Sequence, residues 1–195
     1  MATNPTRKEL SHARIVEVAA KAIRRAGYRG VGVADIMKEA GLTHGGFYAH
    51  FESRDSLLVE AMARAGQDNI DSLTQVIERR MDKGATRFQA LIETYLHEAH
   101  LERTEYGCVI AALSSEMTRQ EDAVRDEARR RVDAMAALVR TALPVGVDES
   151  EAYVVTATML GALQLARTLG GKAGRSLLSH TRQALLQRHT HTTQH

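Results

Sequence analysis

The stretch GLTHGGFYAHF, residues 41–51, gathers residue types that are scarce in the rest of the chain. The chain has three Phe, five Tyr and no Trp, and three of these rings, Phe47, Tyr48 and Phe51, fall within one turn of helix or so. Two glycines and two histidines stand beside them. Because each glycine costs a helix about 1 kcal/mol relative to alanine, such a segment is not built for helix stability alone.

The residues upstream of this stretch predict helices that end in tight turns. The run TRKE at residues 6–9 is a capping box, and it starts a first helix that should end at Gly27. A short helix is expected over residues 33–40, and Gly41 then supplies the left-handed conformation that a tight turn needs. Thr43 is expected to cap the next short helix. A supporting helix followed by two short helices around an Ala-Gly-Leu turn predicts a helix-turn-helix.

This pattern gives the opening stretch an inner and an outer side. Leu42, Phe47 and Phe51 form one apolar set that would anchor the second short helix against its neighbours. A generic helical hairpin, in which the rings are simply core, is the alternative interpretation. The residues left on the outer side are Thr43, His44, Gly45, Gly46, Tyr48 and His50.

The outer side has the chemistry of a DNA contact. The hydroxyls of Thr43 and Tyr48 and the imidazole of His50 can donate to phosphates, and Arg54 can hold another phosphate at the start of the next helix. His44 is the candidate for contact with a base edge, and the two glycines let the backbone approach the groove. The predicted DNA-binding set is therefore Thr43, His44, Gly45, Gly46, Tyr48, His50 and Arg54.

The rest of the chain also predicts helices, because no run alternates between apolar and polar residues with period two. Ser53 should cap the first of them, and a second capping box at residues 118–121 should open another. We expect an all-α protein of about nine helices, with a disordered tail at residues 190–195. The later helices are expected over residues 54–81, 86–104, 108–117, 118–143, 148–169 and 175–188.

Composition narrows the class of protein. The chain has 195 residues, 44% of them hydrophobic, and a single cysteine, so no internal disulfide framework is expected and a reducing cytoplasm is the default. No apolar run is long enough to cross a membrane, and the first ten residues lack the apolar core of a secretion signal. Residues 1–55 hold nine Lys or Arg against six Asp or Glu, which favours a nucleic-acid contact there.

Residues 10–62 resemble the DNA-binding domain of TetR-family transcriptional regulators. Three positions depart from that family: Gly46 stands where Thr or Ser is usual, Gly32 replaces a Ser or Thr cap, and Arg54 replaces a common Lys. The operator sequence therefore does not transfer. The residues that carry the resemblance are Val33, Ile36, Ala40-Gly41-Leu42, Thr43, Gly45, Phe47-Tyr48, His50-Phe51 and Leu57-Leu58.

The resemblance implies a DNA-binding domain over residues 1–53 and a larger helical effector-binding and dimerisation domain over residues 54–189. It implies a ligand-responsive regulator, most often a repressor, that binds double-stranded operator DNA as a homodimer. A small-molecule effector would release it from the operator. The resemblance implies no cofactor and does not identify the effector.

Five residues are expected to line the effector pocket: Tyr95, His97, Tyr106, Cys108 and Glu116. Cys108 stands near the start of an expected helix, where a thiol can have a lowered pKa and react with electrophiles or oxidants. Some TetR-type regulators of detoxification genes sense reactive compounds in this way. A regulator that senses such compounds through Cys108 is therefore the alternative function, and a buried small apolar residue is the other interpretation of this cysteine.

The segment 152–169 is too apolar to be one-sided in a domain of this size, so part of it should meet a second subunit. Ala157 and Gly161 lie one turn apart and would permit close helix packing. The last helix should complete a four-helix interface, although two ordinary core helices would also explain the pattern. The predicted interface consists of Tyr153, Ala157, Leu160, Gly161, Gln164, Leu178 and Leu185.

Catalytic and metal motifs are missing from the sequence. There is no Gly-x-Ser-x-Gly elbow and no Gly-rich phosphate loop, so we expect no enzyme and name no catalytic residue. Glu93, His97 and His100 lie one turn apart and could hold a metal on paper. An exposed helix surface is the preferred interpretation of these three, and we expect no metal site.

Overall fold

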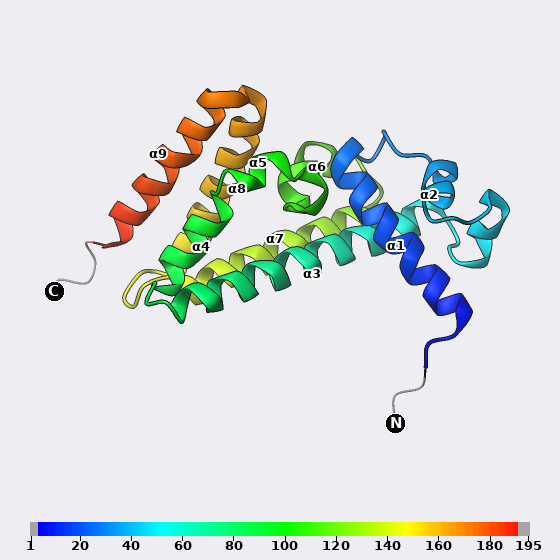
Figure 1. The fold of residues 1–195 in the computed structure, drawn as a ribbon, viewed down its shortest axis with the longest axis horizontal. Coiled ribbons are helices and arrows are strands. Elements are labelled where there is room, and N and C mark those ends of the chain that lie inside the picture. The colour runs from blue at the N-terminus through cyan, green and yellow to red at the C-terminus, as the bar shows by residue number, and fades with distance from the viewer. Residues whose placement is uncertain (1–3, 191–195) are drawn as a thin grey trace. The chain divides into compact units, whose positions relative to one another are not determined.

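The computed structural model describes residues 4–190, and in this range the chain is all-α, as predicted (Figure 1). It contains nine α-helices, two 3₁₀ helices and no strand in the described part. The elements are α1 (Arg7–Ala26), α2 (Val33–Glu39), η1 (His44–Ala49), α3 (Arg54–Met81), α4 (Arg87–Tyr95), α5 (Ala99–Glu102), η2 (Thr104–Tyr106), α6 (Val109–Met117), α7 (Asp122–Ala142), α8 (Glu151–Leu169) and α9 (Gly171–Thr190).

The chain divides into two compact units that do not follow the order of the sequence. The head unit comprises Met1–Gln67 and Glu105–Arg129, and the body unit comprises Asp68–Thr104 and Arg130–His195. Besides residues 1–53, the head unit contains the first half of α3, the whole of α6 and the first part of α7.

The capping box at the start of α1 is formed as predicted. Thr6 Oγ1 accepts a hydrogen bond from the Glu9 amide at 3.2 Å, and Glu9 Oε2 accepts one from the Thr6 amide at 2.6 Å. The helix ends where Gly27 takes a φ of 76°, a conformation that favours glycine. Ser53 also caps as predicted, because its Oγ accepts a hydrogen bond from the Ser56 amide at 3.1 Å.

The predicted single helix over residues 86–104 is wrong, because the chain leaves the helix after Tyr95. The Ala99 amide donates to His97 Nδ1 at 3.2 Å, and the Tyr95 carbonyl pairs with His100 Nδ1 at 2.9 Å. These are the two backbone groups that a continuous helix would join to each other. Two imidazoles therefore interrupt the helix.

The predicted capping box at residues 118–121 does not form, and α7 begins later, at Asp122. Thr118 instead follows the last residue of α6, and the next residues make a turn, in which the Arg119 amide donates to the Glu116 carbonyl at 3.1 Å. The final helix is longer than predicted. It begins at Gly171, and its last residue is Thr190, which belonged to the predicted tail; residues 191–195 lie outside the described range.

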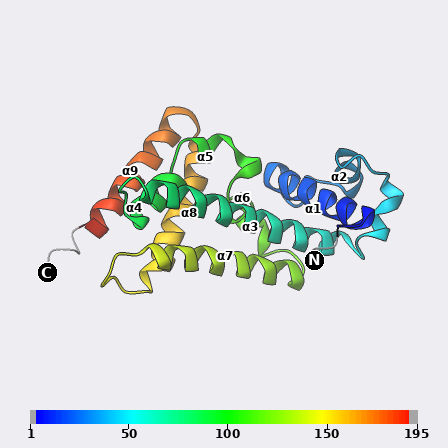
Figure 2. The same cartoon turned by 60° about the horizontal axis from the view of Figure 1, so that its bottom comes forward.

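Each unit has its own apolar core. In the head unit, α1 packs against α2 and α6, and α2 packs against η1, whereas in the body unit α8 and α9 pack along each other (Figures 1 and 2). No described helix is both long and apolar enough to cross a membrane. The head core includes Ile15, Ile23, Ile36, Met37, Phe47, Phe51 and Leu57, and the body core includes Leu91, Ile92, Tyr95, Val155, Met159, Leu163 and Leu178.

Candidate functional site

The short helix of the opening stretch, η1, is a 3₁₀ helix rather than an α-helix. Its backbone bonds span three residues, as in the bond from the Gly46 amide to the Thr43 carbonyl at 3.0 Å. A six-residue segment with two adjacent glycines gains little from α-helical propagation, which explains this geometry. Thr43 stands at the N-cap, but its side chain makes no capping bond, so this part of the prediction is wrong.

The inner side of η1 is anchored as the sequence predicts. Phe47 and Phe51 are buried, and their rings stack with centroids 5.5 Å apart. Gly41 takes a φ of 72°, so the turn from α2 into η1 needs a residue that tolerates the left-handed region. The rings therefore fix η1 on the head core and leave its other side to the solvent.

The outer side of η1 is exposed and has few neighbours within the chain. Tyr48 is 74% exposed, and His44 and Gly45 are also exposed. A Cβ atom added at Gly45 would meet no atom within 4 Å, whereas one added at Gly46 would come to 3.7 Å from Met37 Cε and from Thr43 Oγ1. Within the chain, no packing constraint requires glycine at position 45.

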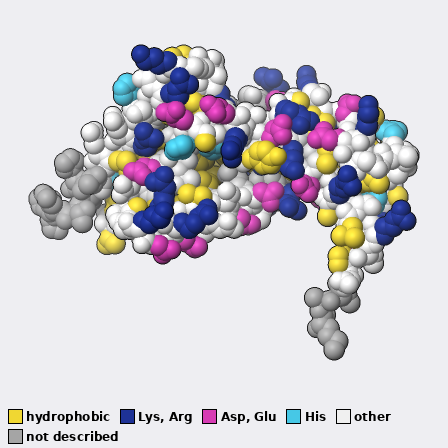
Figure 3. All heavy atoms as spheres, viewed as in Figure 1, with side chains coloured by type: hydrophobic (Ala, Val, Ile, Leu, Met, Phe, Trp, Pro, Cys, Tyr) yellow, Lys and Arg dark blue, Asp and Glu magenta, His cyan; other side chains and the backbone are white. Residues whose placement is uncertain are grey.

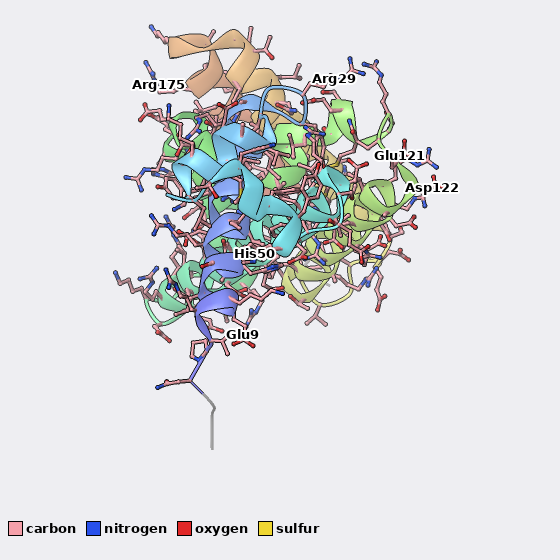
Figure 4. The ribbon with its side chains drawn as sticks, turned by 90° about the vertical axis from the view of Figure 1, so that its right-hand side faces the viewer. Glu9, Arg29, His50, Glu121, Asp122 and Arg175 are labelled. Atoms are coloured by element: carbon pink, nitrogen blue, oxygen red, sulfur yellow. The ribbon has the colours of Figure 1, made fainter. Side chains whose placement is uncertain are left out.

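His50 is the C-cap residue of η1 and is half-buried. Figure 4 marks its position. Its Nδ1 is buried without a hydrogen-bond partner. Burial lowers the pKa of His50 below its usual value, and the nearby charges of His12 and Lys8 lower it further. A neutral imidazole carries one N–H, and in the tautomer with the proton on Nε2 this group can donate to a phosphate.

His12 supports the end of η1 from α1, and no sequence motif indicates this role. Its ring stacks on Phe51 with centroids 4.5 Å apart, and its Nε2 lies 2.6 Å from Glu60 Oε2 on α3. It also lies 6.0 Å from the His50 ring, centroid to centroid. Because an isolated histidine in an exposed stretch of helix carries no motif, only the fold reveals that it joins three elements.

Arg54 is engaged within the head unit. Its Nη2 donates to the Tyr28 carbonyl and also lies 3.4 Å from the Val31 carbonyl, so it holds the connection between α1 and α2. The sequence placed Arg54 at the start of α3, which is correct, but gave no sign of these two bonds. Contact with a DNA phosphate remains a prediction for this residue.

Charges of both signs are interspersed over the surface formed by α1 and α2 on the face drawn in Figure 3. Ion pairs account for part of this pattern, because Arg25 bridges Glu39 at 3.0 Å and Glu105 at 3.3 Å. This face therefore has no large patch of one sign, and a DNA contact there would depend on where individual donors lie.

The five predicted pocket residues fall in different units. Tyr95 and His97 belong to the body unit, where Tyr95 is buried and His97 is exposed. Tyr106, Cys108 and Glu116 belong to the head unit. Cys108 occupies the N-cap of α6, so its predicted position near the start of a helix is correct. The residue is only 1% exposed, as the buried interpretation expects.

Two grooves lie entirely within the body unit, and none of the five predicted residues lines them. The larger, of about 600 Å³, lies between the start of α4, the end of α7 and the end of α9, with Phe88, Pro144 and Leu186 among its walls. The smaller, of about 330 Å³, lies near the start of α9. Both are within the usual size range of small-molecule sites, about 300 to 1,000 Å³.

The outer face of α8 is an exposed apolar stripe. It consists of Tyr153, Ala157, Gly161, Leu165 and Leu169, which follow one another at every fourth position. Leu165 is 59% exposed, and a Cβ added at Gly161 would meet no atom within 4 Å. This set, called the α8 stripe below, can accept a second helix closely.

The other predicted interface residues are placed differently. Leu178 and Leu185 of α9 are buried in the body unit, and Leu160 and Gln164 are half-buried. Leu165 and Leu169 were not predicted, although their spacing from Gly161 is a signal that the sequence contains.

In the described part of the chain, no group of three His, Cys, Asp or Glu side chains is arranged to hold a metal ion.

Two family models match the chain. The one described as "Bacterial regulatory proteins, tetR family" matches residues 15–61, which include η1. The one described as "Tetracyclin repressor-like, C-terminal domain" matches residues 84–185, more than half of the chain.

Individual proteins agree with these matches. The HTH-type transcriptional repressor DhaR of Mycobacterium sp. (strain GP1) is 29% identical over 134 residues, which are 67% of this chain and 61% of that repressor. The alignment thus spans less than two thirds of the repressor. A TetR transcriptional regulator from Chloroflexus aurantiacus J-10-FL has a TM-score of 0.76 at 26% identity, with 96% of each chain covered. A TetR-family regulator from Cytophaga hutchinsonii, at 16% identity and a TM-score of 0.77 over 94% of each chain, shows the same fold.

Proposed function

The chain belongs to the TetR family and is a DNA-binding transcriptional regulator; from this premise, we propose that it is a homodimeric repressor that a small-molecule effector releases from operator DNA. The name of the similar Mycobacterium protein includes the word repressor, which favours repression over activation. Regulation of this kind needs no catalytic step, and binding to chromosomal DNA would take place in the cytoplasm.

The outer side of η1 is the observation that carries the proposal. It offers the hydroxyls of Thr43 and Tyr48 and the ring of His44 beside an open backbone at Gly45. Donors to phosphates position a protein on the duplex, and contacts with base edges specify the sequence. We therefore assign Thr43, Tyr48 and His50 to phosphates and His44 to a base edge, with Gly45 and Gly46 close to the groove.

The α8 stripe supports the homodimer. An apolar face with small residues at its centre and larger ones at its ends can pack on its own copy about a two-fold axis. Two η1 helices would then read the major groove about 34 Å apart, one turn of the duplex. A binding site with two related halves is expected for this arrangement.

The effector acts through differential affinity for two states of the dimer. A ligand that binds better to a state with another separation of the two η1 helices must weaken DNA binding by the same coupling free energy. We keep Tyr95, His97, Tyr106, Cys108 and Glu116 as candidate effector residues. The chemistry of the ligand does not follow from them.

Reaction of Cys108 with an electrophile is the alternative trigger within the same function. One observation favours it: the residue occupies the N-cap of α6, where free backbone N–H groups stabilise a thiolate. The buried thiol would need a local opening before it could react. If a Cys108→Ser variant still releases DNA on treatment with an electrophile, this alternative is excluded.

Selection from a random pool of duplexes tests the function. The full chain should enrich one sequence with two related halves, and its affinity should fall steeply as salt is raised, because phosphate contacts release counterions. The double variant Thr43→Ala/Tyr48→Phe should lose affinity for the enriched duplex. Lys83→Ala, at an exposed position in the body unit, is the matched control and should not. Failure to enrich any duplex would contradict the proposal.

A further inference from the structure

The connection between α1 and α2 is held from outside the helix-turn-helix. It begins at Gly27, and its next residue, Tyr28, has a fully buried ring whose hydroxyl lies 3.4 Å from Met62 Sδ. Burial raises the pKa of this phenol well above its ordinary value, and the charges of Glu116 and Glu127 raise it further. The ring is therefore a neutral anchor, and the backbone on either side of it sets where α2 begins.

Glu116, in the last turn of α6, contacts this connection directly. Its Oε2 accepts a hydrogen bond from the Tyr28 amide at 3.2 Å, across 88 positions of the sequence. A Cβ atom at Gly27 would overlap Oε1 of the same carboxylate. Gly27 thus does two things: it takes the positive φ that ends α1, and it leaves room for the carboxylate.

A second polar contact ties α1 to the other end of α6. Arg24 is buried and donates from Nε to the Ala20 carbonyl at 2.9 Å and from Nη1 to the Gly107 carbonyl at 3.3 Å. Gly107 directly precedes Cys108, the N-cap residue of α6. Arg24 in the last turn of α1 and Tyr28, two residues beyond that helix, therefore contact the chain near both ends of α6.

The same connection is held on its other side by Arg54. The Tyr28 N–H donates to the Glu116 carboxylate, and the Tyr28 carbonyl accepts from the Arg54 guanidinium. A charged acceptor and a charged donor thus fix consecutive backbone groups, and such bonds are stronger than those between neutral groups. Few degrees of freedom remain for the segment that leads into α2.

We propose that Glu116 is a positioning residue for DNA recognition, which acts on η1 from α6 through the Tyr28 amide and the space above Gly27. The proposal rests on the assigned function as a DNA-binding regulator and names a residue outside the matched DNA-binding segment. With the carboxylate in place, α2 and η1 are already ordered when the duplex arrives. Without it, binding must also order the connection, and the affinity falls.

Three variants at position 116 separate the contributions of side-chain length and charge. Binding to the enriched duplex is measured at a temperature far below unfolding, with circular dichroism verifying that every variant is fully folded. Glu116→Ala should bind about tenfold more weakly, the equivalent of one lost charge-assisted hydrogen bond. Glu116→Asp keeps the charge but withdraws it by one methylene, and it should lose as much. Glu116→Gln keeps both the length and an acceptor oxygen, and it should restore most of the affinity.

The matched control is Glu121→Ala, which removes an exposed carboxylate five positions away in the same unit (Figure 4). It should bind like the wild type. Amide hydrogen exchange gives an independent readout: the Tyr28 amide should exchange at least about tenfold faster in the Ala and Asp variants, with the core amides of α1 unchanged.

Gly27→Ala tests the same contact from the other partner. The added methyl overlaps the carboxylate, so the loss of affinity in Gly27→Ala should be partly relieved when Glu116→Ala is added. Wild-type affinity in Glu116→Ala and Glu116→Asp, or strictly additive losses in the double variant, would overturn the positioning role while leaving the regulator function intact. Failure of the wild type to enrich any duplex would instead overturn the function itself.

Discussion

The outer side of η1 and the α8 stripe are both exposed, and both contain a glycine whose added Cβ would meet nothing in the chain. They differ in the chemistry around that glycine. Around Gly45 stand hydroxyls and an imidazole, whereas around Gly161 stand Ala157 and Leu165. Each face leaves room for the close approach of another molecule, and its side chains match the proposed partner, DNA at Gly45 and a second subunit at Gly161.

The difference shows that the role of an exposed glycine has to be inferred from the side chains around it. A glycine with φ in the left-handed region is explained by the backbone, as at Gly41. Gly45 and Gly161 have ordinary φ values and free space, so the chain itself does not require them. The proposed function would explain both, with DNA close to Gly45 and a second subunit close to Gly161.

The largest effect is expected from a charge in the α8 stripe. Leu165→Arg places a cation in the proposed interface twice, once from each subunit, and burying an unpaired charge costs several kcal/mol. The dissociation constant of the dimer should rise by at least about 1,000-fold, or about 4 kcal/mol. Sedimentation over a range of concentrations measures it. Lys83→Glu, which changes charge at an exposed position off the stripe, should leave the dimer intact.

A dimer that survives Leu165→Arg unchanged would break the comparison. It would mean that the α8 stripe is exposed for some other reason and that subunits pair elsewhere. The fold of the single chain should not change in either case, because Leu165 is largely exposed. The unfolding transition of the variant at low concentration provides that check.

The next effect concerns the inner side of α8 and depends on pH. Arg167 donates to the His100 carbonyl at 3.0 Å, and burial lowers the pKa of His100 to about 4. The Tyr95 carbonyl opposes that shift and Arg167 adds to it. Between pH 6.5 and 4, the unfolded state binds a proton that the folded state does not, so stability should fall as the pH is lowered through this window.

The loss should reach at most about 3 kcal/mol at pH 4, since one unit of pKa corresponds to about 1.4 kcal/mol. Urea unfolding at several pH values measures it, and the difference between the wild type and His100→Asn isolates this residue from the carboxylates. Parallel pH profiles for the two proteins would show that His100 does not titrate in this way.

The head could be predicted further than the body because its signals are local. The capping box of α1, the turn at Gly41 and the inner rings of η1 depend on residues within a few positions of one another. The break after Tyr95 depends on two imidazoles that capture backbone groups, which residue periodicity does not express. The sequence suggested an exposed helix surface for these histidines, with a pocket or a metal site as alternatives; His97 is exposed, but His100 is half-buried.

Roles that depend on long-range contacts could not be predicted at all. Glu116 was expected in an effector pocket, and nothing in the sequence connects it with Tyr28, 88 positions away. Arg54 was expected to hold a phosphate, yet it also holds two carbonyls of the head. Its substitution by alanine is therefore a poor test of DNA contact, because it would also loosen the connection between α1 and α2.

A matched pair of glycine substitutions sharpens the comparison directly. Gly45→Ala should weaken binding to the enriched duplex about tenfold, because a methyl group keeps the backbone from the groove, while the dimer is unchanged. Gly161→Ala should weaken the dimer about tenfold, because small-to-large changes in close packing cost about 1–3 kcal/mol. Neither should destabilise the single chain. If either substitution changed both kinds of binding equally, the two faces would not be separate.

The smallest effect is expected from single polar groups on η1, and it distinguishes positioning from specificity. Tyr48→Phe removes one hydroxyl from an exposed ring, so it should weaken binding about fivefold on every duplex, as one hydrogen bond of about 1 kcal/mol does. His44→Ala should instead change which duplexes a random pool yields. Enrichment sequencing of both variants beside the wild type provides the measurement. A phosphate contact does not depend on the base beside it, so only a base reader should alter the sequence preference. If His44→Ala leaves that preference unchanged, His44 does not contact a base edge, and η1 acts as a positioning element alone.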